Sequence, residues 1–113
     1  MTSHVAQGES MAEGLSQRTK EEVDACREAI KSASGSLPAH FNLAMAYIKL
    51  DWFKEASDEL NIVLDLEKDY VPGLYWMGQV QGRLGNASRE VAAYEAALAA
   101  GMKPTIRPNG RPI

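Results

Sequence analysis

The chain carries one pattern of residues twice, beginning at Leu37 and again 34 residues later at Val71. Residues of the same kind recur at matched positions of the two stretches, in the pairs Pro38 and Pro72, Phe41 and Tyr75, Leu43 and Met77, Ala44 and Gly78, Leu50 and Leu84, and Leu64 and Leu98. A fixed period of this length is typical of arrays in which helical units stack on one another. The repeat therefore predicts an all-α protein whose function lies in its surfaces.

The spacing of apolar residues predicts about five antiparallel helices joined by short turns. The first is expected from Gln17 to about Ala33, with Thr19 and Glu22 as a capping box at its start. The others are expected at about Pro38–Leu50, Phe53–Glu67, Pro72–Leu84 and Ala87–Ala100. The predicted organisation is a helical domain at residues 17–104, made of a helix at 17–33 and repeats at 37–70 and 71–104.

The two ends of the chain differ from this domain. Residues 1–16 are rich in Ser, Gly, Gln and Glu without periodic apolar spacing, so they are predicted to be disordered. Residues 105–113 contain two prolines together with Arg107 and Arg111, so they are predicted to form an extended tail.

Composition narrows the class of protein. A length of 113 residues leaves room for one domain, and a net charge of −3 offers no basic footprint for nucleic acid. Cys26 is the single cysteine, which excludes an intrachain disulfide and fits a reducing compartment. The first residues do not read as a secretory signal, and no apolar run is long enough to span a membrane. The expected location is the cytoplasm.

The two units resemble the tetratricopeptide repeat family, whose 34-residue pattern is W-x2-L-G-x2-Y, then A-x3-F, then P. In the first unit Leu43, Ala44 and Tyr47 match the first half, and Ala56 and Leu60 match the second. In the second unit Met77 and Gly78 match, and Tyr94 closes the second half. The N-terminal helix resembles the second half of an earlier unit. This resemblance implies a helix-turn-helix solenoid.

One position departs from the family pattern. Glu90 stands where the pattern has alanine, at the closest approach of two helices, and Glu22 takes the matching position in the N-terminal helix. A carboxylate there needs a partner or a route to water. The second unit is therefore predicted to be packed less tightly than the first, or to have a rotated helix.

In this family the first helix of each unit lines a concave groove. The resemblance assigns to that groove eight residues of this chain, namely Phe41, Asn42, Met45, Ile48, Lys49, Tyr75, Gln79 and Arg83. Such a surface suits a peptide or helix with apolar anchors and some acid. The alternative for Phe41 and Tyr75 is that both are core residues.

Some family members clamp the C-terminal carboxylate of chaperone tails with lysine and asparagine in this groove. Here the matching positions hold Phe41, Met45 and Trp76, and only Asn42 is in place. That clamp is not expected in this chain.

The fifth predicted helix is rich in alanine and nearly apolar all round. Its possible terminal interface comprises Val91, Ala92, Ala96 and Ala99. A terminal repeat normally needs a polar outer face or a capping helix. The tail, a second copy of the chain or a partner protein could cover this surface, and alanine is also simply a strong helix former.

Signals for chemistry are weak. His4 and His40 lack further ligands at metal spacing, and Cys26 lies on the inward stripe of its helix. No cofactor, metal site or reaction is predicted. The expected function is that of a non-catalytic adaptor or assembly factor that binds another protein through the groove and the fifth helix. The alternatives are a homo-oligomer formed through terminal helices and, more remotely, a small enzyme or metal protein.

Overall fold

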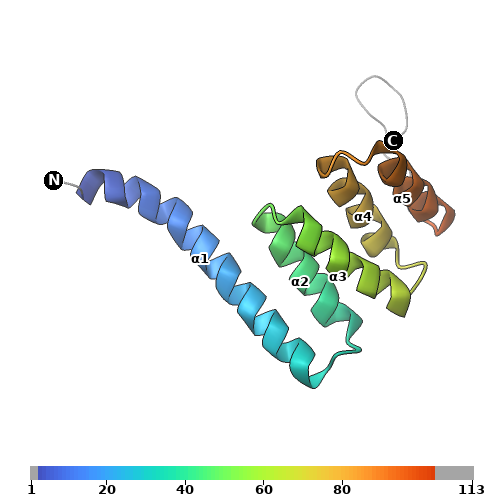
Figure 1. Cartoon of the computed structure of the whole chain (residues 1–113), viewed down its shortest axis with the longest axis horizontal. Coiled ribbons are helices and arrows are strands. Elements are labelled where there is room, and N and C mark those ends of the chain that lie inside the picture. The colour runs from blue at the N-terminus through green and yellow to red at the C-terminus, as the bar shows by residue number, and fades with distance from the viewer. Residues whose placement is uncertain (1–2, 104–113) are drawn as a thin grey trace.

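The computed structural model describes residues 3–103, with side chains described from residue 14 onward. Within this part the chain forms five helices and no strands, which confirms the predicted all-α class. The helices are α1 (Ser3–Ser32), α2 (Leu37–Lys49), α3 (Phe53–Leu66), α4 (Val71–Arg83) and α5 (Ala87–Ala99). Consecutive helices run antiparallel and follow one another in a row (Figure 1). The tail predicted at residues 105–113 lies outside the described residues.

Helix α1 is longer than the sequence predicts. It begins at Ser3 instead of Gln17, so helix replaces the disorder predicted for most of residues 1–16. The hydroxyl of Thr19 donates to the carbonyl of Leu15 at 3.0 Å, inside the helix, and the predicted capping box at Thr19 and Glu22 is therefore wrong. The physical reason is that no proline precedes Gln17, and an existing helix extends at little cost once it is nucleated. The N-terminal half of α1 projects past α2 (Figure 1).

Three helices end in the same kind of turn. The amide of the second residue beyond the helix cap donates back to a carbonyl five residues earlier, at 2.9 Å in each case: Trp52 to Tyr47, Asn86 to Gln81, and Met102 to Ala97. This arrangement needs a positive φ angle at the residue between. Gly85 (81°) and Gly101 (116°) supply it without strain, whereas Asp51 (59°) is the one non-glycine residue of the described chain with a positive φ.

The core is built by consecutive helices. The extensive contacts join α1 to α2, α2 to α3, α3 to α4 and α4 to α5. Ala44, Ala56 and Leu60 are fully buried, because small residues let the backbones of α2 and α3 approach and Leu60 fills the space beside them. The outer helices α1 and α5 each have one extensive neighbour. The molecule is therefore a short solenoid whose units support each other in sequence.

The second unit accommodates Glu90 through its partner helix. Glu90 is half-buried, and a Cβ atom added at Gly82 of α4 would lie 2.5 Å from its carboxylate oxygen Oε2. In the first unit the two matching positions hold Ile48 on α2 and Ala56 on α3. The large residue therefore lies on the first helix of the first unit and on the second helix of the second unit. Helices α4 and α5 contact each other as extensively as α2 and α3, and the predicted loosening of the second unit does not occur.

Candidate protein-binding surface

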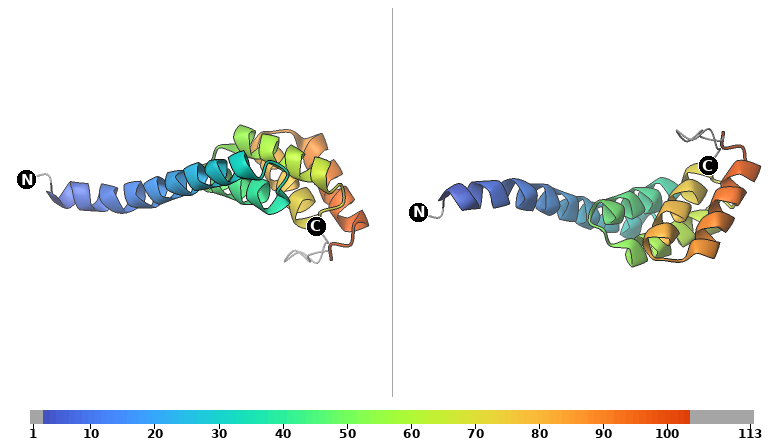
Figure 2. Two further views of the ribbon diagram at one scale, coloured as in Figure 1. Left: turned by 90° about the horizontal axis from the view of Figure 1, so that it is seen from below. Right: turned by 90° about the horizontal axis from the view of Figure 1, so that it is seen from above.

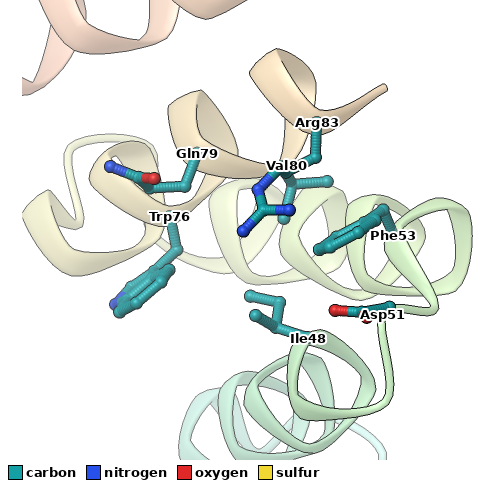
Figure 3. A pocket seen from close by; sticks show the side chains of 7 residues that line it. All are labelled: Ile48, Asp51, Phe53, Trp76, Gln79, Val80 and Arg83. Carbon is teal, nitrogen blue, oxygen red and sulfur yellow. The ribbon is translucent and has the colours of Figure 1, made fainter. Parts of the chain in front are cut away.

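A small hollow of about 90 Å³ lies where the end of α2 faces α4. Its walls come from α2, the following turn, the start of α3 and α4, and comprise Ile48, Asp51, Phe53, Trp76, Gln79, Val80 and Arg83 (Figure 3). The first helix of each unit thus contributes to it, as the resemblance implies for a groove.

The hollow combines apolar walls with charge of both signs. The guanidinium carbon of Arg83 lies 5.4 Å from the ring centroid of Phe53, a distance at which a cation is attracted by the face of an aromatic ring. Figure 3 shows the Arg83 side chain reaching over the hollow, with Asp51 beside Phe53. Trp76 is half-buried, and its ring meets that of Tyr75 edge-on at 5.3 Å. The hollow can therefore hold an apolar side chain next to a charged group.

The structure brings three of the eight predicted groove residues into this hollow, namely Ile48, Gln79 and Arg83. Tyr75 lies beside it, accepts a hydrogen bond from Nε2 of Gln79 at 3.1 Å, and has its ring 6.0 Å from that of Tyr94. Tyr75 is half-buried. It is therefore neither a fully buried core residue nor a fully exposed groove residue. Its ring supports Trp76 while part of it remains accessible.

The other predicted groove residues lie elsewhere on α2. Phe41 is half-buried and packs edge-to-face on Tyr70 at 5.5 Å, and Met45 packs against the core. Asn42 is exposed. Lys49 is also exposed, and its Nζ atom lies 3.3 Å from Oε2 of Glu22 on α1. Lys49 lines a separate hollow of about 600 Å³ between α1 and α2, so it does not share the hollow with Arg83.

The sequence analysis placed Trp76 at a clamp position but did not count it among the eight groove residues, and it did not assign Phe53 and Asp51 to the groove. A signal for Trp76 was present, since it lies 34 residues after Asn42, which was assigned there. No comparable signal exists for Phe53 and Asp51. The position of Phe53 at the start of α3 and the sharp turn at Asp51 bring them to the hollow only when the helices pack.

The predicted terminal residues Val91, Ala92, Ala96 and Ala99 are exposed on α5, and Val91 is 54% exposed. The buried alanines of the same helix are Ala93 and Ala97. Ala92 contributes to a third hollow, between α3 and α5, while the structure places Val91, Ala96 and Ala99 in none of the hollows described here.

His40 has a structural role in this fold. It is 5% exposed, with Nδ1 2.7 Å from Oε1 of Glu59 on α3 and Nε2 2.7 Å from the carbonyl of Ser34 before α2. Burial by itself lowers the pKa of His40, but the hydrogen bonds to Glu59 and Ser34 and the charge of Glu59 outweigh burial, so the pKa is raised above its ordinary value of 6.5. The ring of His40 therefore joins α3 to the turn that precedes α2.

Cys26 is half-buried on α1, and burial together with the charge of Glu22 raises the pKa of its thiol. A raised pKa keeps a thiol in its unreactive protonated form. Within residues 3–103, no three His, Cys, Asp or Glu side chains gather as ligands for a metal ion. None of the helices in this range is long and apolar enough to cross a membrane.

Comparisons with known proteins show which families and structures this architecture resembles. Residues 37–70 match the family model for the tetratricopeptide repeat, and no curated protein sequence matches the chain. A crystal structure of MamA has a TM-score of 0.72 at 22% identity over 81% of this chain, which spans about half (52%) of the MamA chain.

Two structures of a protein named Spaghetti (RPAP3) are also similar. Its first TPR, bound to the HSP90 peptide SRMEEVD, has a TM-score of 0.72 at 19% identity and covers 83% of this chain and 72% of that chain. Its second TPR, bound to the same peptide, has a TM-score of 0.71 at 19% identity, with 82% and 83% covered. Residues 37–70 therefore carry a tetratricopeptide repeat, and the described part of the chain shares the fold of these structures.

Proposed function

We propose that the chain is a non-catalytic adaptor that binds a peptide segment of another protein across α2 and α4, with the hollow at Trp76 as the anchor site. The observation that carries this proposal is the meeting of Ile48, Trp76 and Arg83 at one open hollow. An apolar pocket beside a charged group is what gives a peptide both affinity and orientation.

The size and charge of the hollow favour a particular peptide. A cavity of about 150 Å³ holds benzene, so a hollow of about 90 Å³ suits a branched aliphatic side chain better than an aromatic one. Arg83 at the rim favours an acidic residue next to that anchor. The peptide seen with both Spaghetti domains, SRMEEVD, has two glutamates followed by valine, which is the same chemistry.

Clamping of a terminal carboxylate by lysine and asparagine is not part of this proposal. Trp76 occupies one of the positions concerned, and Lys49 is paired with Glu22 of α1. Arg83 is the cation at the hollow, and it recognises an acidic side chain within the segment.

A phage library of random peptides, selected against the full chain, tests this proposal. Selected peptides are expected to share an aliphatic residue next to Asp or Glu. Arg83→Glu should weaken their binding at least about tenfold because it places like charges together, and Trp76→Ala should do the same by removing a wall. Lys49→Glu is the matched control, with the same charge change outside the hollow, and should change affinity less than about twofold. An equal loss in Arg83→Glu and Lys49→Glu would contradict the proposal.

Self-association is the second candidate. It is favoured by the single extensive neighbour of α5 and by the exposure of Val91 on it. Light scattering over a hundredfold range of concentration separates the two functions. A mass that stays that of one chain excludes self-association, while a rising mass that Val91→Glu suppresses supports it.

A further inference from the structure

The hollow between α3 and α5 has a volume of about 390 Å³ and has α4 as its floor. It is lined by Ser57, Asn61, Leu64, Leu74, Met77, Gln81, Arg89, Ala92 and Ala93, none of which lines the hollow at Trp76. Figure 2 shows α3 on the opposite side of the molecule from α2 and α4. This hollow is therefore separate from the proposed peptide groove.

The matching place between α1 and α3 is filled by the protein itself. One repeat earlier, 34 residues before Gln81 and Asn61, the chain has Tyr47 and Arg27. There the guanidinium of Arg27 donates to the Tyr47 hydroxyl from Nη2 at 2.7 Å and from Nε at 3.1 Å, and lies 5.7 Å from the ring centroid. The ring of Tyr47, with the guanidinium of Arg27 bound to it, thus occupies the first junction.

The remaining pair at the first junction is also replaced by smaller residues. Leu74 and Ala93 stand where the first unit has His40 and Glu59, which bond to each other. Four interacting side chains of the first junction have thus become two amides and two aliphatic groups in the second. The hollow lies where the second junction lacks the aromatic ring and its partners.

The hollow has an apolar floor and an ordered polar wall. Leu74, Met77 and Ala93 are buried at its base. Gln81 is held by three hydrogen bonds: its Nε2 donates to Oγ of Ser57 at 3.0 Å and to Sδ of Met77 at 3.4 Å, and its Oε1 accepts from Nδ2 of Asn86 at 2.9 Å. This wall is formed before any ligand arrives, which lowers the entropic cost of binding.

Arg89 supplies the charge. It is exposed at the rim and has no ion-pair partner among the described residues, in contrast to Lys31, His40 and Lys49. An unpaired guanidinium beside an apolar floor favours a ligand that carries a carboxylate close to a ring. The first junction supplies the template, because a tyrosine beside an arginine fills the same place there.

We infer that the α3–α5 hollow is a second binding site, which accepts an aromatic side chain from an acidic segment of a partner protein. The ring lies on Leu74, Met77 and Ala93, and a neighbouring carboxylate pairs with Arg89. The site is independent of the hollow at Trp76, so the chain can hold two protein segments on opposite sides. The chain's own C-terminal tail does not suit this site, because it carries Arg107 and Arg111 and no acidic side chain that could pair with Arg89.

The test uses the full chain and a blocked pentapeptide in which a central tyrosine is flanked by two acidic residues on each side. Binding is followed by amide chemical shifts in the NMR spectrum of the protein. The expected shifts are at Ser57, Asn61 and Ala92. A peptide with alanine in place of tyrosine, and one with lysines in place of the acids, should each bind at least about fivefold more weakly.

Variants give the sharper comparison. Arg89→Glu is expected to weaken the tyrosine peptide about tenfold, whereas Arg89→Lys should keep most of the affinity. Ala92→Trp should block the hollow, while Ala96→Trp, an equal change at an exposed position of α5 that does not line the hollow, should not. Arg83→Glu should leave this binding unchanged, so that failure of one site is distinguishable from failure of the other.

Several outcomes would overturn the inference. They are shifts confined to α2 and α4, equal affinity in Arg89→Glu and wild type, or equal binding of the lysine peptide. Binding that appears only after removal of residues 104–113 would assign the hollow to the tail. A molecular mass that rises with protein concentration in light scattering, and that added peptide lowers, would assign the hollow to a second copy of the chain.

Discussion

At the scale of single residues, the repeat is maintained by paired exchanges of side-chain size. Ala44 and Leu60 of the first unit correspond to Gly78 and Tyr94 of the second, so a smaller residue on α4 faces a larger one on α5. A Cβ atom at Gly78 would lie 2.5 Å from Cε1 of Tyr94. Close packing thus constrains pairs of positions more strongly than either position alone.

Two glycines of α4 allow a matched test of this packing. Gly78→Ala is expected to lower the free energy of unfolding by about 1–2 kcal/mol, because the ring of Tyr94 is held by Tyr75 and the overpacking cost exceeds the gain of about 1 kcal/mol in helix propensity. Gly82→Ala should be neutral or stabilising, since the Glu90 carboxylate that it meets is the end of a flexible chain. Urea unfolding of both variants measures this. Equal effects would contradict the explanation.

The His40 pair predicts how stability depends on pH. The pKa of His40 is raised in the folded protein, so its contribution is fully present below the ordinary pKa of about 6.5 and is lost as the pH rises through the higher folded pKa. The free energy of unfolding, measured by urea titration between about pH 5.5 and 8.5, should therefore decrease with rising pH.

A double variant serves as the control for this pH dependence. His40→Leu with Glu59→Ala copies the residues Leu74 and Ala93 of the second unit and leaves no unpaired carboxylate behind. This decrease with pH should be absent from the double variant. A dependence on pH that survives in it would assign the effect to another group.

At the scale of helices and turns, the two units differ most clearly at the end of their first helices. Asp51 and Gly85 occupy matching positions, and both have positive φ angles. A left-handed conformation costs an L-residue roughly 1–2 kcal/mol, partly offset by the greater entropy that glycine loses on folding. The first turn therefore retains a small amount of strain, next to the hollow at Trp76.

Exchanging these turn residues tests that explanation. Asp51→Gly is expected to raise the free energy of unfolding by about 0.5 kcal/mol, while Gly85→Ala should lower it by about 1 kcal/mol because alanine disfavours positive φ. Thermal unfolding followed by circular dichroism gives both values. A loss of stability in Asp51→Gly would mean that the Asp51 side chain stabilises the turn.

At the scale of the whole molecule, stability should vary along the row of helices. Helices α2, α3 and α4 have extensive neighbours on both sides, and α1 and α5 on one side. In a solenoid the free energy is nearly a sum of neighbour terms. Native-state hydrogen exchange should therefore find the slowest amides in α2, α3 and α4 and faster ones in α5 and α1. Uniform protection would indicate a single cooperative unit.

The sequence by itself determined the repeating framework of this protein. Two patterns, the 3–4 spacing of apolar residues and the 34-residue period, place α2 to α5 within one residue of their observed ends. They act through local geometry and through contacts between neighbouring helices, both of which recur in each unit. The assignment of α2 and α4 to a groove, with Ile48 and Gln79 on it, came instead from the resemblance to the tetratricopeptide repeat family and stays a prediction.

The tertiary structure decided how the units differ. The length of α1 depends on helix propagation into a segment without apolar periodicity, which pattern reasoning could not see. The meeting of Trp76 with Phe53, and the open hollow beside Arg89, depend on side chains from separate helices whose volumes combine only after packing. A period predicts that two helices will touch, but whether their junction is filled, as at Tyr47, or left open, as at Gln81, is decided by three-dimensional packing.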